Sequence, residues 1–167
     1  MPDYETMPFH LETERLLLRP WDPSDASWFA ELLAERDGEP REVERIRTAI
    51  TELLDATATT GIALLPILRR AEGDVIGYCG LIIGRATLDE PEIAYELFRH
   101  AHGRGYATEA AAAVLGAAAA TGRTRLWSTV GTWNAPSLRV LEKLEFTRDR
   151  VTREPNGEVA WLTRPLP

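Results

Sequence analysis

The stretch HGRGYATEAAAAVLG, residues 102–116, has the clearest chemical meaning in this chain. Gly103 and Gly105 flank Arg104, and an alanine-rich segment that favours a helix follows at once. A helix start presents free backbone N–H groups and the positive end of the helix dipole, so it is suited to bind an anion. Glycines let a phosphate approach the backbone because they have no Cβ in the way. The stretch therefore predicts a phosphate-binding site.

Two familiar phosphate-binding motifs do not fit this stretch. A dinucleotide fingerprint needs a third glycine at the position of Thr108. A Walker A loop needs Lys and then Ser or Thr at the point where Tyr106 follows Gly105. A nucleotide- or NAD-binding protein is therefore disfavoured. The two glycines alone are equally compatible with a tight strand-to-helix turn that binds no ligand.

A second pattern, NAPSLRVLEKLEF over residues 134–146, follows one helix and one strand later. Together with EIAYELF and GRGYATEA it resembles the GNAT acetyltransferase superfamily, most closely its RimJ/RimL-like branch of N-terminal and small-amine acetyltransferases. That branch carries similar motifs in the same order, and TERLLLRPWDPSDA and VIGYCGL match its opening and third strands. The resemblance covers roughly residues 11–163, and the joint pattern is specific where each motif alone is not.

The resemblance implies that acetyl-CoA is the co-substrate held by these motifs. The implied cofactor-binding residues come from three segments: Leu97, Phe98 and Arg99; His102, Gly103, Arg104, Gly105, Tyr106, Ala107 and Thr108; and Asn134 with Ser137. The first segment would pair with the pantetheine arm like an extra strand, and backbone amides of the second would surround the pyrophosphate. The third would face the pantetheine amide and the sulfur. No metal is expected, because the histidines and Cys79 lack metal-ligand spacing.

The reaction that the resemblance implies is direct attack of a neutral amine on the acetyl thioester. It needs a hydrogen-bond donor for the carbonyl oxygen, for which a backbone N–H of residues 97–99 is expected, and a proton for the leaving thiolate. The tyrosine that many relatives use as general acid is Leu141 here, which leaves Ser137 as the candidate donor, with a helix cap as its alternative role. Glu92 and Glu154 are the candidate bases, with solvated surface carboxylates as the alternative.

The acceptor is expected to be a protein N-terminal α-amine or a small-molecule amine, because an α-amino group is easier to deprotonate at pH 7 than a lysine amine. Leu141, together with Glu145 where the branch has glycine, leaves a second function open: a non-catalytic acetyl-CoA-binding or scaffold protein. His100 also departs from the branch's pattern. Four aromatic residues would line the acceptor cleft unless they belong to the core: Trp21, Trp28, Trp133 and Tyr95.

Periodicity and turn residues predict the elements that position these groups. The expected strands are 13–21, 62–70, 74–84, 91–99, 125–133, 146–153 and 158–164. Helices are expected after Asp22 as N-cap and over 41–57, 105–121 and 135–144, with Gly122 as a C-cap. Pro66 marks its strand as an edge or bulged one. The order predicts one α/β (α+β mixed) GNAT-like domain over residues 1–167, with a mixed, mostly antiparallel sheet of about seven strands and helices on both faces.

Composition agrees with a single soluble domain. The 167 residues are 44% hydrophobic and 27% charged, enough to bury a core without disulfides or metals. The net charge of −7 argues against general nucleic-acid binding. No apolar run reaches about 18 residues and no signal segment opens the chain, so we expect a cytoplasmic protein that does not bind membranes. Because dimers are common in the branch, a homodimer is an expected state.

Overall fold

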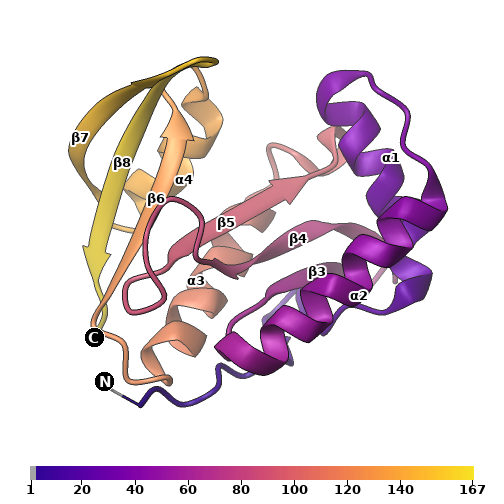
Figure 1. Cartoon of the computed structure of the whole chain (residues 1–167), viewed down its shortest axis with the longest axis horizontal. Coiled ribbons are helices and arrows are strands. Elements are labelled where there is room, and N and C mark those ends of the chain that lie inside the picture. The colour runs from indigo at the N-terminus through magenta and orange to yellow at the C-terminus, as the bar shows by residue number, and fades with distance from the viewer. Residues whose placement is uncertain (1–2) are drawn as a thin grey trace.

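The computed structural model describes residues 3–167 and contains one mixed sheet with helices on both faces (Figure 1). The strands are β1 (Leu11–Glu12), β2 (Leu16–Leu18), β3 (Leu64–Arg69), β4 (Val75–Ile82), β5 (Glu92–Leu97), β6 (Arg125–Gly131), β7 (Thr147–Glu154) and β8 (Gly157–Pro165). The α-helices are α1 (Ala26–Asp37), α2 (Val43–Thr60), α3 (Tyr106–Ala119) and α4 (Ala135–Lys143). The predicted fold class is confirmed, and the sheet has eight strands because residues 11–12 add β1.

The strand order β1-β2-β3-β4-β5-β6-β8-β7 contains one parallel neighbour pair, β5 with β6. These two strands are in register only at Glu92 and Trp127, and beyond that point they diverge (Figure 1). The other edge of β5 stays paired with β4 from Glu92 to Leu97. The sheet therefore opens between the carboxyl ends of β5 and β6, and the β5 backbone that faces the opening has no strand partner there.

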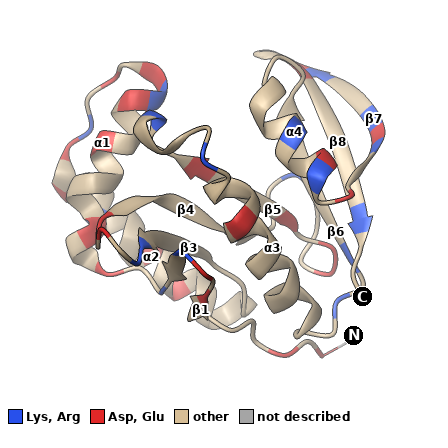
Figure 2. Ribbon diagram, turned by 180° about the vertical axis from the view of Figure 1, so that it is seen from behind, with Lys and Arg blue, Asp and Glu red and all other residues tan. Residues whose placement is uncertain are grey.

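The helices form two layers over the sheet, each with its own hydrophobic cluster. On one face lies α3, whose alanines pack closely on the strands; Ala110, Ala111 and Ala118 are fully buried. Seen from behind, α3 carries no charged residue beyond its first turn, as expected for a helix against a sheet (Figure 2). The opposite face is covered by α1 and α2, with Trp21 and Ile50 at the centre of a smaller cluster.

A local signal explains where the first helical segment begins. Asp22 accepts a hydrogen bond from the N–H of Ser24, while Asp25 accepts one from the N–H of Asp22, which is the reciprocal arrangement of a capping box. These bonds cap the short 3-10 helix Pro23–Asp25, which leads directly into α1.

Within residues 3–167, no helix combines the length and the apolar composition needed to cross a membrane.

Two boundary predictions need correction. Pro66 does not lie on an edge strand, because β3 is paired on both sides, with β2 and β4; the register shift follows at Ile67 and Leu68, in agreement with the bulged alternative. The third helix ends earlier than predicted. Its C-cap is Ala120, and Gly122 lies two residues further on with a left-handed φ of 87°.

Candidate active site

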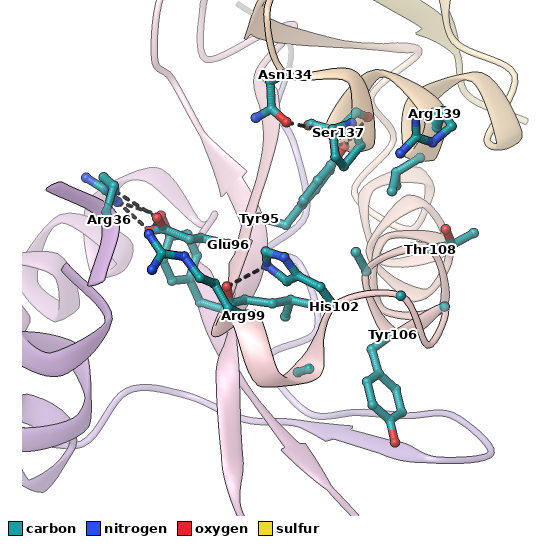
Figure 3. Close-up of a pocket in the computed structure, with 18 of the residues that line it drawn as sticks. Arg36, Tyr95, Glu96, Arg99, His102, Tyr106, Thr108, Asn134, Ser137 and Arg139 are labelled. Atoms are coloured by element: carbon teal, nitrogen blue, oxygen red, sulfur yellow. Dashed lines mark hydrogen bonds and ion pairs between the residues drawn. The ribbon is translucent and has the colours of Figure 1, made fainter. Parts of the chain in front are cut away.

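A cavity of about 690 Å³ lies at the opening between β5 and β6 (Figure 3). Its walls are the end of β5, the start of α3, the start of α4 and the last turn of α1. Ten of the twelve predicted cofactor-binding residues line it: Leu97, Arg99, His102, Gly103, Gly105, Tyr106, Ala107, Thr108, Asn134 and Ser137. The other two do not line it. Phe98 is buried and stacks on His100, and the carbonyl of Arg104 accepts a hydrogen bond from Arg15.

The predicted anion site at the start of α3 has the backbone geometry that the glycines were expected to supply. Gly103 and Gly105 have φ values of 75° and 80°, in the left-handed region that favours glycine. Gly105 is the N-cap of α3 and supplies no side-chain cap. Among residues 3–167, the N–H groups of residues 106–108 find no acceptor. These amides and the helix dipole are therefore available to an anionic ligand.

The loop is held by a side-chain network that no local pattern in the sequence predicts. Arg15 donates from Nη1 to the carbonyl of Arg104 at 2.9 Å and from Nε to Oε1 of Glu109 at 2.7 Å, and its guanidinium lies 4.4 Å from the ring centroid of Tyr106. Glu109 also accepts from the hydroxyl of Thr13. Burial would raise the pKa of Glu109, but these hydrogen bonds outweigh it and the pKa is lowered. Glu109 thus supports the loop through its charge.

Asn134, Ser137 and Tyr95 form a connected group across the opening, with Tyr95 pointing toward Ser137 (Figure 3). The side-chain oxygen of Asn134 accepts from the N–H of Ser137 at 3.2 Å, so Asn134 is the N-cap of α4. The Ser137 hydroxyl donates to the Tyr95 hydroxyl at 3.1 Å, and Tyr95 donates to the Ser137 carbonyl at 3.0 Å. The capping alternative for the Ser137 hydroxyl is therefore wrong. Leu141, which occupies the general-acid position of the resembled family, is fully buried in the core.

A second cavity of about 370 Å³ shares Tyr95, Asn134 and Ser137 with the first, so these three residues separate the two spaces. Glu92 lines the second cavity and is only 3% exposed. One carboxylate oxygen accepts from the N–H of Arg85 at 2.5 Å, and the other accepts from the N–H and the hydroxyl of Thr129 at 3.0 and 2.6 Å. The alternative view of Glu92 as a solvated carboxylate is wrong.

Glu154 has a different environment from Glu92. Both of its carboxylate oxygens accept from the guanidinium of Arg85, each at 2.7 Å, and it lines neither of these two cavities. These hydrogen bonds from Arg85 lower the pKa of Glu154. Glu154 is therefore a weaker base than an ordinary glutamate, and the structure separates it from Glu92 through the intervening Arg85.

Three backbone N–H groups, those of residues 97–99, were candidates to donate a hydrogen bond to the thioester carbonyl oxygen, and they differ in whether they are free. The N–H of Phe98 donates to the carbonyl of Ile76 at 2.9 Å, and that of Arg99 donates to the carboxylate of Glu35 at 2.7 Å. Backbone groups alternate in direction along a strand, so the N–H of Leu97 faces the opening toward β6. The Leu97 carbonyl faces the same way and accepts from Nε2 of His102 at 2.9 Å (Figure 3). Leu97 is therefore the available donor.

The aromatic residues divide between the core and the site. Trp21 and Trp28 are stacked with ring centroids 5.3 Å apart and belong to the cluster under α1, so their expected place in a cleft is wrong. Trp133, 79% exposed, and Tyr95 line the larger cavity.

The last turn of α1 adds two residues to the cavity wall that the sequence did not single out. Arg36 forms a bidentate ion pair with Glu96 on β5 (Figure 3). Glu35 accepts a hydrogen bond from the N–H of Arg99. These contacts join residues 60 and 64 positions apart, and no local motif marks them.

The chain is similar to known proteins both in its sequence and in its fold. Residues 15–147 match the family model described as acetyltransferase (GNAT) domain. An uncharacterized N-acetyltransferase, p20 of Bacillus licheniformis, is 26% identical over 156 residues, which cover 86% of this chain and 85% of that protein. An acetyltransferase structure from Agrobacterium tumefaciens strain C58 has a TM-score of 0.77 and 27% identity, with 98% of each chain covered.

A third match is the structure of RimL, a ribosomal L7/L12 α-N-protein acetyltransferase in complex with coenzyme A. Its TM-score is 0.80, and the match covers 97% of this chain and 98% of that one. The identity of 15% makes this a likeness of fold.

Proposed function

Because the chain belongs to the GNAT acetyltransferase family, we propose that its site transfers the acetyl group of acetyl-CoA to a protein N-terminal α-amine or another amine of low pKa. The observation that carries this proposal is the meeting of two cavities at Tyr95, Asn134 and Ser137. A transfer between two substrates requires both to reach one point from different directions. The larger cavity, with its free amides, suits the cofactor, and the smaller cavity, with Glu92, suits the amine.

The larger cavity offers each part of acetyl-CoA a matching group. The unpaired amides of residues 106–108 are suited to the pyrophosphate, because they combine hydrogen-bond donors with the positive end of α3. The unpaired edge of β5 is suited to the pantetheine amides, which would continue the sheet. The Leu97 N–H is then the donor to the thioester carbonyl oxygen as negative charge develops on it.

Glu92 is the better candidate for the base. The carboxylates of Glu96 and Glu154 are each held by an arginine, Arg36 and Arg85 respectively. Glu92 is instead held by two backbone N–H groups and the hydroxyl of Thr129, within the smaller cavity. Glu92 removes the proton from the attacking nitrogen, directly or through one water, as the C–N bond forms and the C–S bond breaks.

The preference for an α-amine follows from the free energy of deprotonation. Making a lysine amine neutral at pH 7 costs about 4.6 kcal/mol, whereas an α-amino group costs only about 1–1.4 kcal/mol. An α-amine therefore needs less help from a single carboxylate base than a lysine amine does. The name of the RimL match, an α-N-protein acetyltransferase, describes an acceptor of the same class.

The experiment that tests the proposal is a steady-state assay of free thiol release from acetyl-CoA, run with a panel of amines. The expected result is thiol release that depends on a peptide with a free N-terminus. The panel includes the same peptide with its N-terminus blocked, as well as polyamines and free amino acids. A protein that binds acetyl-CoA but releases no thiol with any amine would instead be the non-catalytic alternative, and would contradict the proposal.

A further inference from the structure

Tyr95 occupies the point where the sheet opens. It lies on β5 three residues beyond Glu92, the last residue at which β5 and β6 are in register. Its ring packs against the main core, and it is one of the three residues that line both cavities. A side chain in this place contacts the space where the thioester and the amine have to meet.

The hydroxyl of Tyr95 makes two hydrogen bonds, both to Ser137 and therefore to the first turn of α4. With the bond from the Ser137 N–H to Asn134, all three polar groups of Ser137 have partners, two of them supplied by Tyr95. Among residues 3–167, no other side chain is hydrogen-bonded to the Ser137 hydroxyl. The direction of that hydroxyl is thus set by one phenol that lies 42 residues away in the sequence.

The phenol is also chemically suited to hold a serine without exchanging its own proton. Burial raises the pKa of Tyr95, so the hydroxyl stays protonated over the working range of pH. A phenol O–H both donates and accepts. Tyr95 can therefore turn its hydrogen from the carbonyl oxygen of Ser137 to the hydroxyl oxygen of Ser137. Ser137 is then free to direct its own hydrogen at the sulfur while it accepts from Tyr95.

We propose that Tyr95 is a positioning residue that directs the Ser137 hydroxyl at the sulfur of the leaving coenzyme A; this rests on the proposed function. As the C–S bond breaks, its electron pair stays on sulfur and is stabilised by the Ser137 O–H. The proton that completes the thiol is the one that Glu92 takes from the amine, returned through water. Neither hydroxyl loses its proton overall, and atoms and charge balance.

The test is the pKa of the thiol of bound coenzyme A, measured without any acceptor from the ultraviolet absorbance of the thiolate against pH. A hydrogen bond to the thiolate lowers this pKa, so both Tyr95→Phe and Ser137→Ala are expected to raise it by roughly half to one unit relative to the wild type. In the Ser137→Ala background, Tyr95→Phe is expected to add nothing, because Tyr95 acts through Ser137. With acetyl-CoA and an acceptor, kcat should fall in both variants while KM for acetyl-CoA stays unchanged.

Thr121→Val is the matched control, since it removes a buried hydroxyl at the far end of α3 and should move only the melting temperature. An unshifted thiol pKa in Tyr95→Phe would overturn the proposal, and so would equal shifts from Tyr95→Phe in the presence and absence of Ser137. The titration needs no turnover, so its failure is distinct from a failure of the thiol-release assay. If the wild type releases no thiol but the titration gives the expected pattern, the positioning role stands and the proposed transfer reaction does not.

Discussion

The two cavities on either side of Tyr95 are built from different parts of the polypeptide. The larger cavity, called the cofactor cavity after its proposed ligand, is lined chiefly by two continuous stretches, residues 97–108 and 133–143, and offers the free backbone N–H groups of residues 106–108. The smaller cavity, called the acceptor cavity after its proposed ligand, depends on side chains that different elements bring together, such as Glu92 from β5 and Thr129 from β6. A backbone site needs only a local conformation, which glycines mark in the sequence. A side-chain site needs the sheet to be complete before its chemistry exists.

The largest effect is expected from the acceptor cavity. Glu92→Gln keeps the shape of the side chain but removes the base, so kcat should fall by roughly 10²–10⁴-fold with coenzyme A affinity nearly unchanged. Glu154→Gln is the matched control, because Glu154 is held by Arg85 and lines neither cavity. Steady-state kinetics of both variants with one peptide acceptor compare them. Equal losses in the two variants would remove the distinction between these carboxylates.

The next largest effect is expected from the cofactor cavity. Gly105 has a φ of 80°, and a Cβ there would lie 3.4 Å from Nη2 of Arg15, in the supporting network of the loop. Gly105→Val should therefore weaken coenzyme A binding by at least about 100-fold, or about 2.7 kcal/mol, when measured by calorimetry. Gly116→Ala, in the same helix with nothing within 4 Å of the added Cβ, should bind normally. Normal binding by Gly105→Val would place the amide site elsewhere.

Two ion pairs that hold the chain near helix starts differ in how deeply they are buried. Asp25, which anchors the start of α1, is almost fully buried and accepts hydrogen bonds from Arg19 and from the Trp28 indole N–H. The pair Arg15–Glu109, beside the loop of residues 102–105, is more exposed. Asp25→Asn should lower the free energy of unfolding by roughly 2–3 kcal/mol, and Glu109→Gln by less than about 1 kcal/mol. Denaturant titration measures both, and equal losses would contradict this ranking.

Asp25 also makes the stability of the folded protein depend on pH. Burial would raise the pKa of Asp25, but the hydrogen bonds from Arg19 and Trp28 outweigh it, so the pKa in the folded state is below the unfolded value. The stabilisation by Asp25 is therefore fully present above the ordinary aspartate pKa of about 4, and it is lost as the pH falls through the lower folded value. Asp25→Asn should consequently flatten the decline of stability with acid. An unchanged acid profile in this variant would assign the decline to other carboxylates.

The smallest effect concerns Glu145, which follows α4 with a φ of 66°. The branch that the sequence resembles has glycine at this position, and glycine allows this conformation without strain. Glu145→Gly should raise the free energy of unfolding by about 0.5–1 kcal/mol and leave kcat unchanged. Such a result would make this departure a matter of backbone strain, whereas a change in kcat would connect Glu145 with the acceptor side.

These contrasts also explain which parts could be predicted from the sequence. The glycine loop, the cap at Asp22 and the order of the elements depend on neighbouring residues, so the sequence predicts them. The hydrogen bonds of Glu92 with Thr129 and of Arg85 with Glu154 join residues 37 and 69 positions apart. Their geometry depends on the register of the sheet, which no local pattern encodes. For the same reason, no local pattern shows that the Glu92 side chain is buried.

The most direct test of the account is to find where the acetyl group goes. A peptide with a free N-terminus and one internal lysine is incubated with the protein and acetyl-CoA at pH 7, and the product is sequenced by mass spectrometry. We expect one acetyl group, on the α-amine, formed only when acetyl-CoA is present and strongly reduced with Glu92→Gln. Acetylation at the lysine with equal efficiency, or an unmodified peptide with acetyl-CoA left intact while the protein binds it, would contradict the account.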